Sequence, residues 1–171
     1  MEKSNLAFAI IIFIILFIGL TIKEISEAPL IDREDVLDAY AKVDITRVTY
    51  RNEDLGRDVE AVLYMPVNYI PGSKIPGVVF GRGSGDAEKQ VEKWEAFNVR
   101  YSRLGNALIF PLNEHRSYKT SWTDYKYAAK YLEDEYGIEN IGCAGTSLGN
   151  MEIMMFVQED DRCDAYVNIG G

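Results

Sequence analysis

The sequence has 171 residues, of which 47% are hydrophobic and 26% are charged, a composition that suits one folded domain with a substantial core and argues against a disordered or fibrous protein. Its net charge of -9 argues against nucleic acid as a partner, because binding to phosphate backbones requires clustered Lys and Arg. The two cysteines, Cys143 and Cys163, are too few and too far apart for a disulfide scaffold or a Cys/His zinc site, and we expect both to be buried thiols.

The N-terminus carries an uncharged apolar segment, residues 6–22, which begins with Leu6 and ends with Ile22. At about 1.5 Å per residue a helix of this length reaches roughly 26 Å, just enough to span a bilayer. We therefore expect a single-pass N-terminal membrane anchor. A cleaved signal sequence ending near Ala28 is the main alternative, and a buried core helix is a third reading. The flanking charges hardly discriminate between orientations, and an extracytoplasmic domain is the orientation that we favour.

A polar segment, residues 23–42, follows as a juxtamembrane linker, so the folded domain is expected over residues 43–171. Residues 44–50 and 59–65 are rich in β-forming side chains. Residues 52–56 supply turn-forming Asn, Asp and Gly between them. The pattern predicts an antiparallel hairpin at the start of the sheet.

Short apolar runs then alternate along the chain with segments in which apolar residues recur every three or four positions, as in an amphipathic helix. The runs predict buried strands at residues 77–80, 107–110, 138–144 and 165–169. The spacings predict helices at residues 91–104, 122–136 and 148–158. We expect Thr120 or Ser121 to be the N-cap of the second helix and Gly137 to close it. The alternation predicts an α/β domain with a mostly parallel sheet.

One motif carries nucleophilic chemistry. Gly145-Thr146-Ser147-Leu148-Gly149 matches the GxSxG nucleophile elbow and lies between a predicted buried strand and an apolar helix, as that motif requires. The glycines Gly145 and Gly149 relieve crowding in the strained turn that projects the Ser147 hydroxyl. The N–H of Leu148, at the helix start, points toward a developing oxyanion. The competing interpretation is a plain tight turn whose serine caps the helix.

A glycine-rich loop, Gly81-Arg82-Gly83-Ser84-Gly85-Asp86, follows the strand at residues 77–80. In a nucleophile-elbow protein the loop after this strand donates the second oxyanion N–H, which makes the backbone of Gly83 and Ser84 the candidate. A dinucleotide site is disfavoured because the spacing is GxGxG rather than GxGxxG. A glycine turn without a ligand is the other alternative.

The segment from Trp122 through Tyr136-Gly137-Ile138 to the GxSxG motif resembles the helix, strand and elbow of the α/β-hydrolase family, in the region of its dienelactone-hydrolase-like and prolyl-oligopeptidase-like members. The resemblance implies a three-layer sandwich of which about six of eight strands are present. It also implies Ser147 as nucleophile, the Gly83 and Ser84 region as oxyanion loop, and no metal or organic cofactor.

Two residues depart from the family pattern. Arg82 stands where the family usually has His, and Asn150 follows the elbow where Gly is common. We expect Arg82 to be a surface or sheet-edge contact, with binding of an acidic substrate group as the alternative. Neither change forbids catalysis.

The triad acid and base are the missing part of the predicted site. In this family the chain order is Ser, acid, His, and no histidine follows Ser147. The acidic residues Glu159, Asp160, Asp161 and Asp164 do follow it, but we expect them in a solvated turn at the opposite edge of the parallel sheet from Ser147. The sole histidine, His115, precedes Ser147 and would lie two strands away, roughly 10 Å at about 4.8 Å per strand. A bent loop could bring it within reach as a base, but we favour a polar loop histidine.

The sequence therefore predicts a membrane-anchored serine hydrolase that cleaves an ester, thioester or peptide through Ser147, with a small-molecule or peptide acyl substrate. We expect the present chain to be its N-terminal part, with the remainder of the hydrolase on another segment. The alternative is a catalytically inactive, membrane-tethered pseudohydrolase or binding module.

Overall fold

The computed structural model describes residues 42–114 and 117–170 of the chain. The expected membrane anchor at residues 6–22 and nearly all of the linker lie outside these residues. Within the described part, no helix is both long and apolar enough to cross a membrane.

A long hairpin opens the domain, as predicted. Strands β1 (Val43–Asn52) and β2 (Arg57–Pro66) pair antiparallel over their whole length, with Val43 opposite Pro66 and Asn52 opposite Arg57. The Oδ1 atom of Asn52 accepts the Leu55 N–H at 3.1 Å, and Gly56 takes a φ of +61°. The Asn and Gly of the turn thus provide the side-chain acceptor and the positive φ that a tight turn requires.

Four further strands complete the sheet in the described part of the chain: β3 (Gly77–Gly81), β4 (Ala107–Pro111), β5 (Ile141–Gly145) and β6 (Ala165–Asn168). The strand order is β1-β2-β4-β3-β5-β6. Strand β2 runs antiparallel to β4, and β4, β3, β5 and β6 are mutually parallel. Every residue of β3 and β4 is buried, which explains why these strands are continuous apolar runs.

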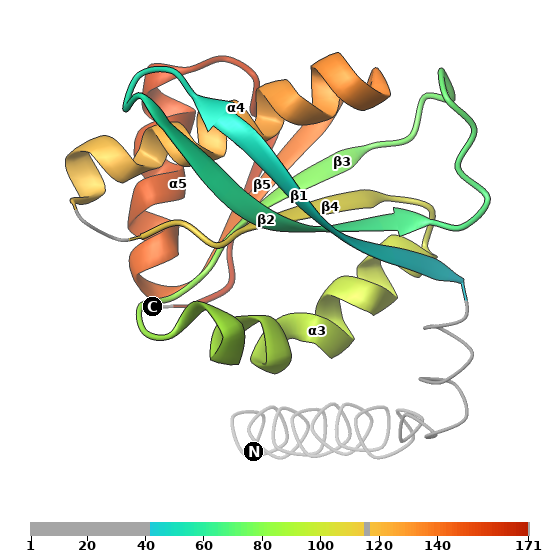
Figure 1. Ribbon diagram of the computed structural model, residues 1–171, viewed down its shortest axis with the longest axis horizontal. Coiled ribbons are helices and arrows are strands. Elements are labelled where there is room, and N and C mark those ends of the chain that lie inside the picture. The colour runs from blue at the N-terminus through green and yellow to red at the C-terminus, as the bar shows by residue number, and fades with distance from the viewer. Residues whose placement is uncertain (1–41, 115–116, 171) are drawn as a thin grey trace, which may run out of the picture. The chain divides into compact units, whose positions relative to one another are not determined.

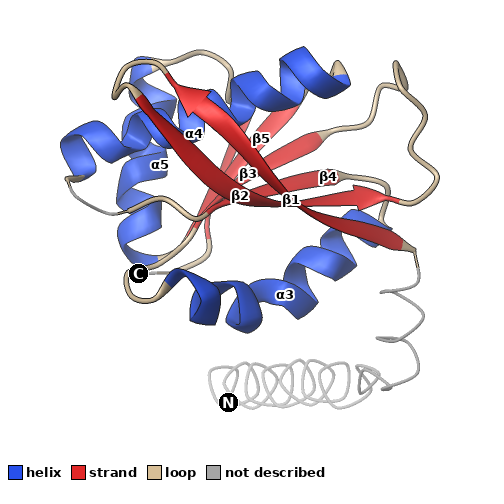
Figure 2. Cartoon of the chain, in the orientation of Figure 1, coloured by secondary structure: helices blue, strands red, loops and turns tan. Residues whose placement is uncertain are grey.

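Helices cover both faces of the sheet (Figures 1 and 2). Helix α3 (Ala87–Arg103) lies on one face, whereas α4 (Tyr118–Tyr136) and α5 (Ser147–Glu159) lie side by side on the other. The core is correspondingly divided into two clusters. The first packs against α4 and α5 and includes Leu63, Ile109, Ala128, Leu132, Ile153 and Phe156, and the second packs against α3 and includes Tyr64, Phe80, Val99, Leu108 and Phe110. The predicted three-layer α/β arrangement is confirmed.

Three predicted boundaries are wrong. Helix α3 begins at Ala87, four residues before the predicted start at residue 91. The N-cap of α4 is Ser117, not Thr120 or Ser121, because the helix begins one turn earlier than the hydrophobic spacing indicates. Strand β5 begins at Ile141 rather than at residue 138. Gly137 closes α4 in the left-handed conformation as predicted, and the next N–H, that of Ile138, still donates to a helix carbonyl. Residue 138 therefore belongs to the helix cap, not to the strand.

The expectation of two free thiols is also wrong, because Cys143 and Cys163 form a disulfide across a Cα–Cα distance of 5.9 Å. Cys143 lies in β5, and Cys163 lies in the loop that leads into β6. The crossover through α5 returns the chain alongside β5, where the Asp164 N–H donates to the Ile141 carbonyl at 2.8 Å. Cys143 and Cys163 are 20 residues apart in the sequence. The parallel pairing of β5 with β6 brings them close together in space.

Candidate active site

Ser147 occupies a strained turn between β5 and α5. Its φ is +50°, and it is the only non-glycine residue with a positive φ in the described ranges. Its side chain is exposed at the carboxyl end of the parallel strands. Left-handed backbone at a non-glycine residue costs free energy and persists where the surrounding fold enforces it. This is the backbone geometry that a nucleophile elbow requires.

Both glycines of the motif are required by close backbone packing. A Cβ atom on Gly145 would lie 2.6 Å from the Asn150 Cα atom. A Cβ atom on Gly149 would overlap the carbonyl groups of Gly81 and Arg82. The first turn of α5 therefore packs directly against the end of β3, and larger residues would displace Ser147.

The predicted oxyanion loop lies beside the serine. A Cβ atom built on Gly83 would lie 3.5 Å from the Ser147 Cβ atom. Within residues 42–114 and 117–170, the N–H groups of Leu148 and Ser84 have no hydrogen-bond acceptor. The structure thus brings Ser147, Leu148, Gly83 and Ser84 to one edge of the sheet. Their catalytic roles stay predictions.

The segment after β6 also contacts the elbow. The Ser147 N–H and the Thr146 hydroxyl both donate to the Gly170 carbonyl, at 2.8 Å and 3.0 Å. The side chain of Asn150 accepts the hydroxyl of Tyr166, in β6, at 2.5 Å. Asn150, which stands where the family commonly has Gly, therefore connects helix α5 to strand β6.

The sequence predicts that Arg82 is a surface or sheet-edge contact. It lies directly after β3, but the surface position is wrong because only 3% of the residue is exposed. Its Nη1 atom donates to the carbonyls of Gly83 and Gly85 at 3.1 Å and 2.9 Å, and its Nη2 atom donates to the Asn113 carbonyl. Burial lowers the pKa of Arg82, while the nearby Tyr125 and Glu152 act in the opposite direction. Arg82 folds back under its own loop because the loop carbonyls there lack strand partners.

Sequence analysis missed a buried carboxylate beneath the elbow. Glu152 in α5 is fully buried and accepts the Tyr125 hydroxyl at 3.0 Å and the Asn113 side-chain amide at 3.4 Å. Burial, followed by the charge of Glu152, raises the pKa of Tyr125 well above its usual value. One signal was available: Glu152 is the only charged residue between positions 148 and 158. We call Arg82, Asn113, Tyr125 and Glu152 the elbow cluster.

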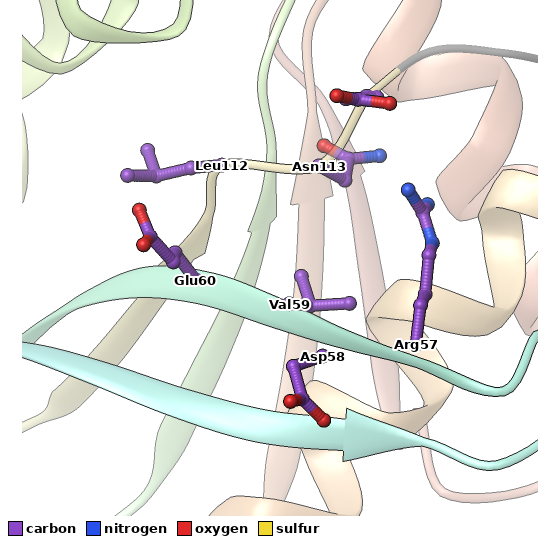
Figure 3. A pocket seen from close by; sticks show the side chains of 7 residues that line it. Arg57, Asp58, Val59, Glu60, Leu112 and Asn113 are labelled. Carbon is purple, nitrogen blue, oxygen red and sulfur yellow. The ribbon is translucent and has the colours of Figure 1, made fainter.

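A polar cavity of about 380 Å³ lies between the start of β2 and the loop after β4 (Figure 3). Neither Ser147 nor Gly83 lines it. Its wall includes Asn113 of the elbow cluster, toward which the side chain of Arg57 extends. The residues that line it are Arg57, Asp58, Val59, Glu60, Leu112, Asn113 and Glu114.

His115 lies outside the described residues, so the structure does not place the candidate base. Strand β3 separates β4 from β5, so the strand that precedes residue 115 and the strand that precedes Ser147 are not neighbours. Among the residues that the structure describes, no group of His, Cys, Asp and Glu could hold a metal ion.

Neither protein-family models nor curated proteins match this sequence. Solved structures do match its fold. A hypothetical protein from Pseudomonas aeruginosa is 23% identical, with a TM-score of 0.61 over 75% of this chain and 43% of its own. A cold-adapted esterase from an Arctic intertidal metagenomic library is 20% identical, with a TM-score of 0.60 over 74% of this chain and 60% of its own.

Oligopeptidase B from Leishmania major is 12% identical, with a TM-score of 0.57 over 75% of this chain and 20% of its own. The chain thus spans less than two thirds of each of these three proteins. Other solved structures that match are esterases and peptidases of the α/β-hydrolase fold, and the described part of the chain has this fold.

Proposed function

We propose that this chain supplies the nucleophile and the oxyanion-binding backbone of a membrane-anchored serine hydrolase. The observation that carries the proposal is the left-handed backbone of Ser147, placed at the end of a parallel strand with the Gly83 backbone beside it. A serine that served only to cap a helix would need no positive φ.

In the proposed reaction the Ser147 Oγ atom attacks the carbonyl carbon of an ester, thioester or peptide. Its proton passes to a histidine outside the described residues, which then protonates the leaving group as the acyl bond breaks. The N–H groups of Leu148 and Ser84 bind the oxyanion. Water then attacks the acyl-enzyme, releases the acid and restores the Ser147 hydroxyl. No metal or organic cofactor takes part in these steps.

The disulfide supports an extracytoplasmic orientation for the domain. Disulfides persist in oxidising compartments and are rare in the cytosol, and Cys143 and Cys163 are paired here. Together with the apolar segment at residues 6–22, this pairing favours a domain exported by, and tethered through, its N-terminus.

Hydrolysis of a p-nitrophenyl acyl ester by the natural full-length protein tests the proposal. Ser147→Ala should reduce the rate by about 10³-fold or more, because the nucleophile is lost while the fold is kept. Ser73→Ala is the control, since the buried Ser73 hydroxyl has no partner among the described residues and lies in the loop before β3. It should retain the wild-type rate. Equal rates for wild type and Ser147→Ala would refute the proposal and favour a pseudohydrolase, whose biological activity would not depend on Ser147.

A further inference from the structure

The elbow cluster links the predicted oxyanion loop to the helix that carries the nucleophile. Arg82 follows β3, Asn113 follows β4, Tyr125 lies in α4, and Glu152 lies in α5 five residues after Ser147. Each of the four residues is at most 3% exposed. Hydrogen bonds run from Arg82 to the Asn113 carbonyl, and from the Asn113 amide and Tyr125 hydroxyl to Glu152.

The bonds of Arg82 determine the direction of loop peptide groups. In a trans peptide the C=O and the following N–H point to opposite sides, and the described residues contain no cis peptide bond. Because the guanidinium holds the Gly83 carbonyl, the N–H of Ser84 must point away from the buried Arg82. The bond to the Gly85 carbonyl, at 2.9 Å, fixes the loop two residues further on.

A buried guanidinium is tolerated only where charge and hydrogen bonds compensate its lost hydration. The charge of buried Glu152, which is bound by Tyr125 and Asn113, acts on Arg82. The Nη1 and Nη2 atoms of Arg82 donate to backbone carbonyls, and its Nε atom has no partner among the described residues. The planar fork of Arg suits this geometry, whereas the single ammonium of Lys cannot reach three carbonyls at once.

We infer that Arg82 is a positioning residue that aims the Ser84 N–H at the Ser147 site, and that buried Glu152 keeps Arg82 in place through Asn113. The inference rests on the proposed function for its catalytic consequence. Its structural part, the fixing of the loop, can be measured without catalysis.

The test compares backbone ¹⁵N relaxation order parameters in the full chain for wild type, Arg82→Lys, Glu152→Gln and Arg162→Lys. Arg162, in the loop between α5 and β6, is the matched control, because it is ion-paired to Asp160 and to Glu133 of α4. Loss of two or three charge-assisted hydrogen bonds should lower the order parameters of residues 83–86 from about 0.85 to below about 0.6 in Arg82→Lys. Glu152→Gln, which keeps the side-chain size but removes the charge, should lower them by about 0.1 or more. The β1–β2 hairpin should keep its wild-type order parameters in both, and Arg162→Lys should leave residues 83–86 unchanged.

Labelling of Ser147 by a fluorophosphonate probe gives the second readout. Its rate should fall by about 10-fold or more in Arg82→Lys and be unchanged in Arg162→Lys. If wild type is not labelled at all, the proposed function fails, and the order parameters alone decide whether Arg82 fixes the loop. Order parameters at residues 83–86 that stay at their wild-type values in both elbow variants would overturn the inference. So would an equal fall in the loop and the hairpin in both variants, because that would show a general loss of order.

Discussion

Helix α4 contributes to two buried carboxylate clusters through adjacent residues. Asp124 faces the hairpin, where its carboxylate accepts Arg57 and Asn52, each at 2.6 Å. Tyr125, the next residue, faces α5 and donates to Glu152. We call Asp124, Arg57 and Asn52 the hairpin cluster. Both carboxylates are fully buried, but they are compensated in different ways.

The two clusters differ in the group that the arginine guanidinium binds. In the hairpin cluster Arg57 binds the carboxylate directly, which joins α4 to β2. In the elbow cluster Tyr125 and Asn113 donate to Glu152, whereas Arg82 donates to backbone carbonyls. The first arrangement connects secondary structure elements, whereas the second fixes the direction of peptide groups. We therefore expect damage to the hairpin cluster to appear as lost stability, and damage to the elbow cluster as lost order beside Ser147.

The largest expected effect on stability comes from Arg57→Leu. It leaves the Asp124 carboxylate buried without its cation, and breaking such a pair costs about 3 kcal/mol. Urea unfolding should show this loss, while the backbone order parameters of residues 83–86 should stay at their wild-type values.

Arg51→Leu is the control for Arg57→Leu, because Arg51 lies in the same hairpin but its ion pair with Asp58 is exposed. Its cost should be below about 1 kcal/mol. Equal costs for the two variants would contradict the role of the hairpin cluster.

A substitution at Ser147 is expected to change the free energy of unfolding by a smaller amount and in the opposite direction. Ser147→Gly should raise the free energy of unfolding by about 1 kcal/mol, because Gly adopts the φ of +50° without the steric cost paid by Ser. The same variant should lose fluorophosphonate labelling completely. Thermal unfolding measures the gain, and a loss of stability would show that the Ser147 backbone is not strained.

The last expected effect is on the pH dependence of stability. Burial raises the pKa of Tyr131 to about 12, from a usual value of 10.0. The unfolded phenol ionises near pH 10, whereas the folded one keeps its proton until about pH 12. The stability contributed by neutral Tyr131 is therefore complete below pH 10 and is lost as pH rises through that window.

Tyr131 packs on Tyr50 of the hairpin, with ring centroids 5.9 Å apart. Tyr131→Phe should keep this packing and flatten the loss of stability between pH 10 and pH 12, as measured by urea unfolding at each pH. Parallel losses in wild type and variant would show that Tyr131 does not contribute to the alkaline loss of stability.

The sequence predicted those features that depend on local pattern. The hairpin, the buried strands and the elbow at Ser147 follow from turn residues, apolar runs and the GxSxG spacing. The burial of Arg82 and the pairing of Cys143 with Cys163 did not follow, because each depends on which strands become neighbours. Glu152 could have been recognised as an isolated charge in an apolar helix, but Tyr125 and Asn113, which donate to it, lie in two other segments of the chain. Pairings of this kind require the three-dimensional structure.

The most direct test of the central claim is fluorophosphonate labelling of the natural full-length protein, followed by mapping of the modified residue. The account predicts one labelled site, Ser147, with labelling lost after heat denaturation, because reactivity depends on the folded elbow and the loop beside it. Labelling of other serines, or no labelling of the folded protein, would contradict the assignment of Ser147 as a nucleophile.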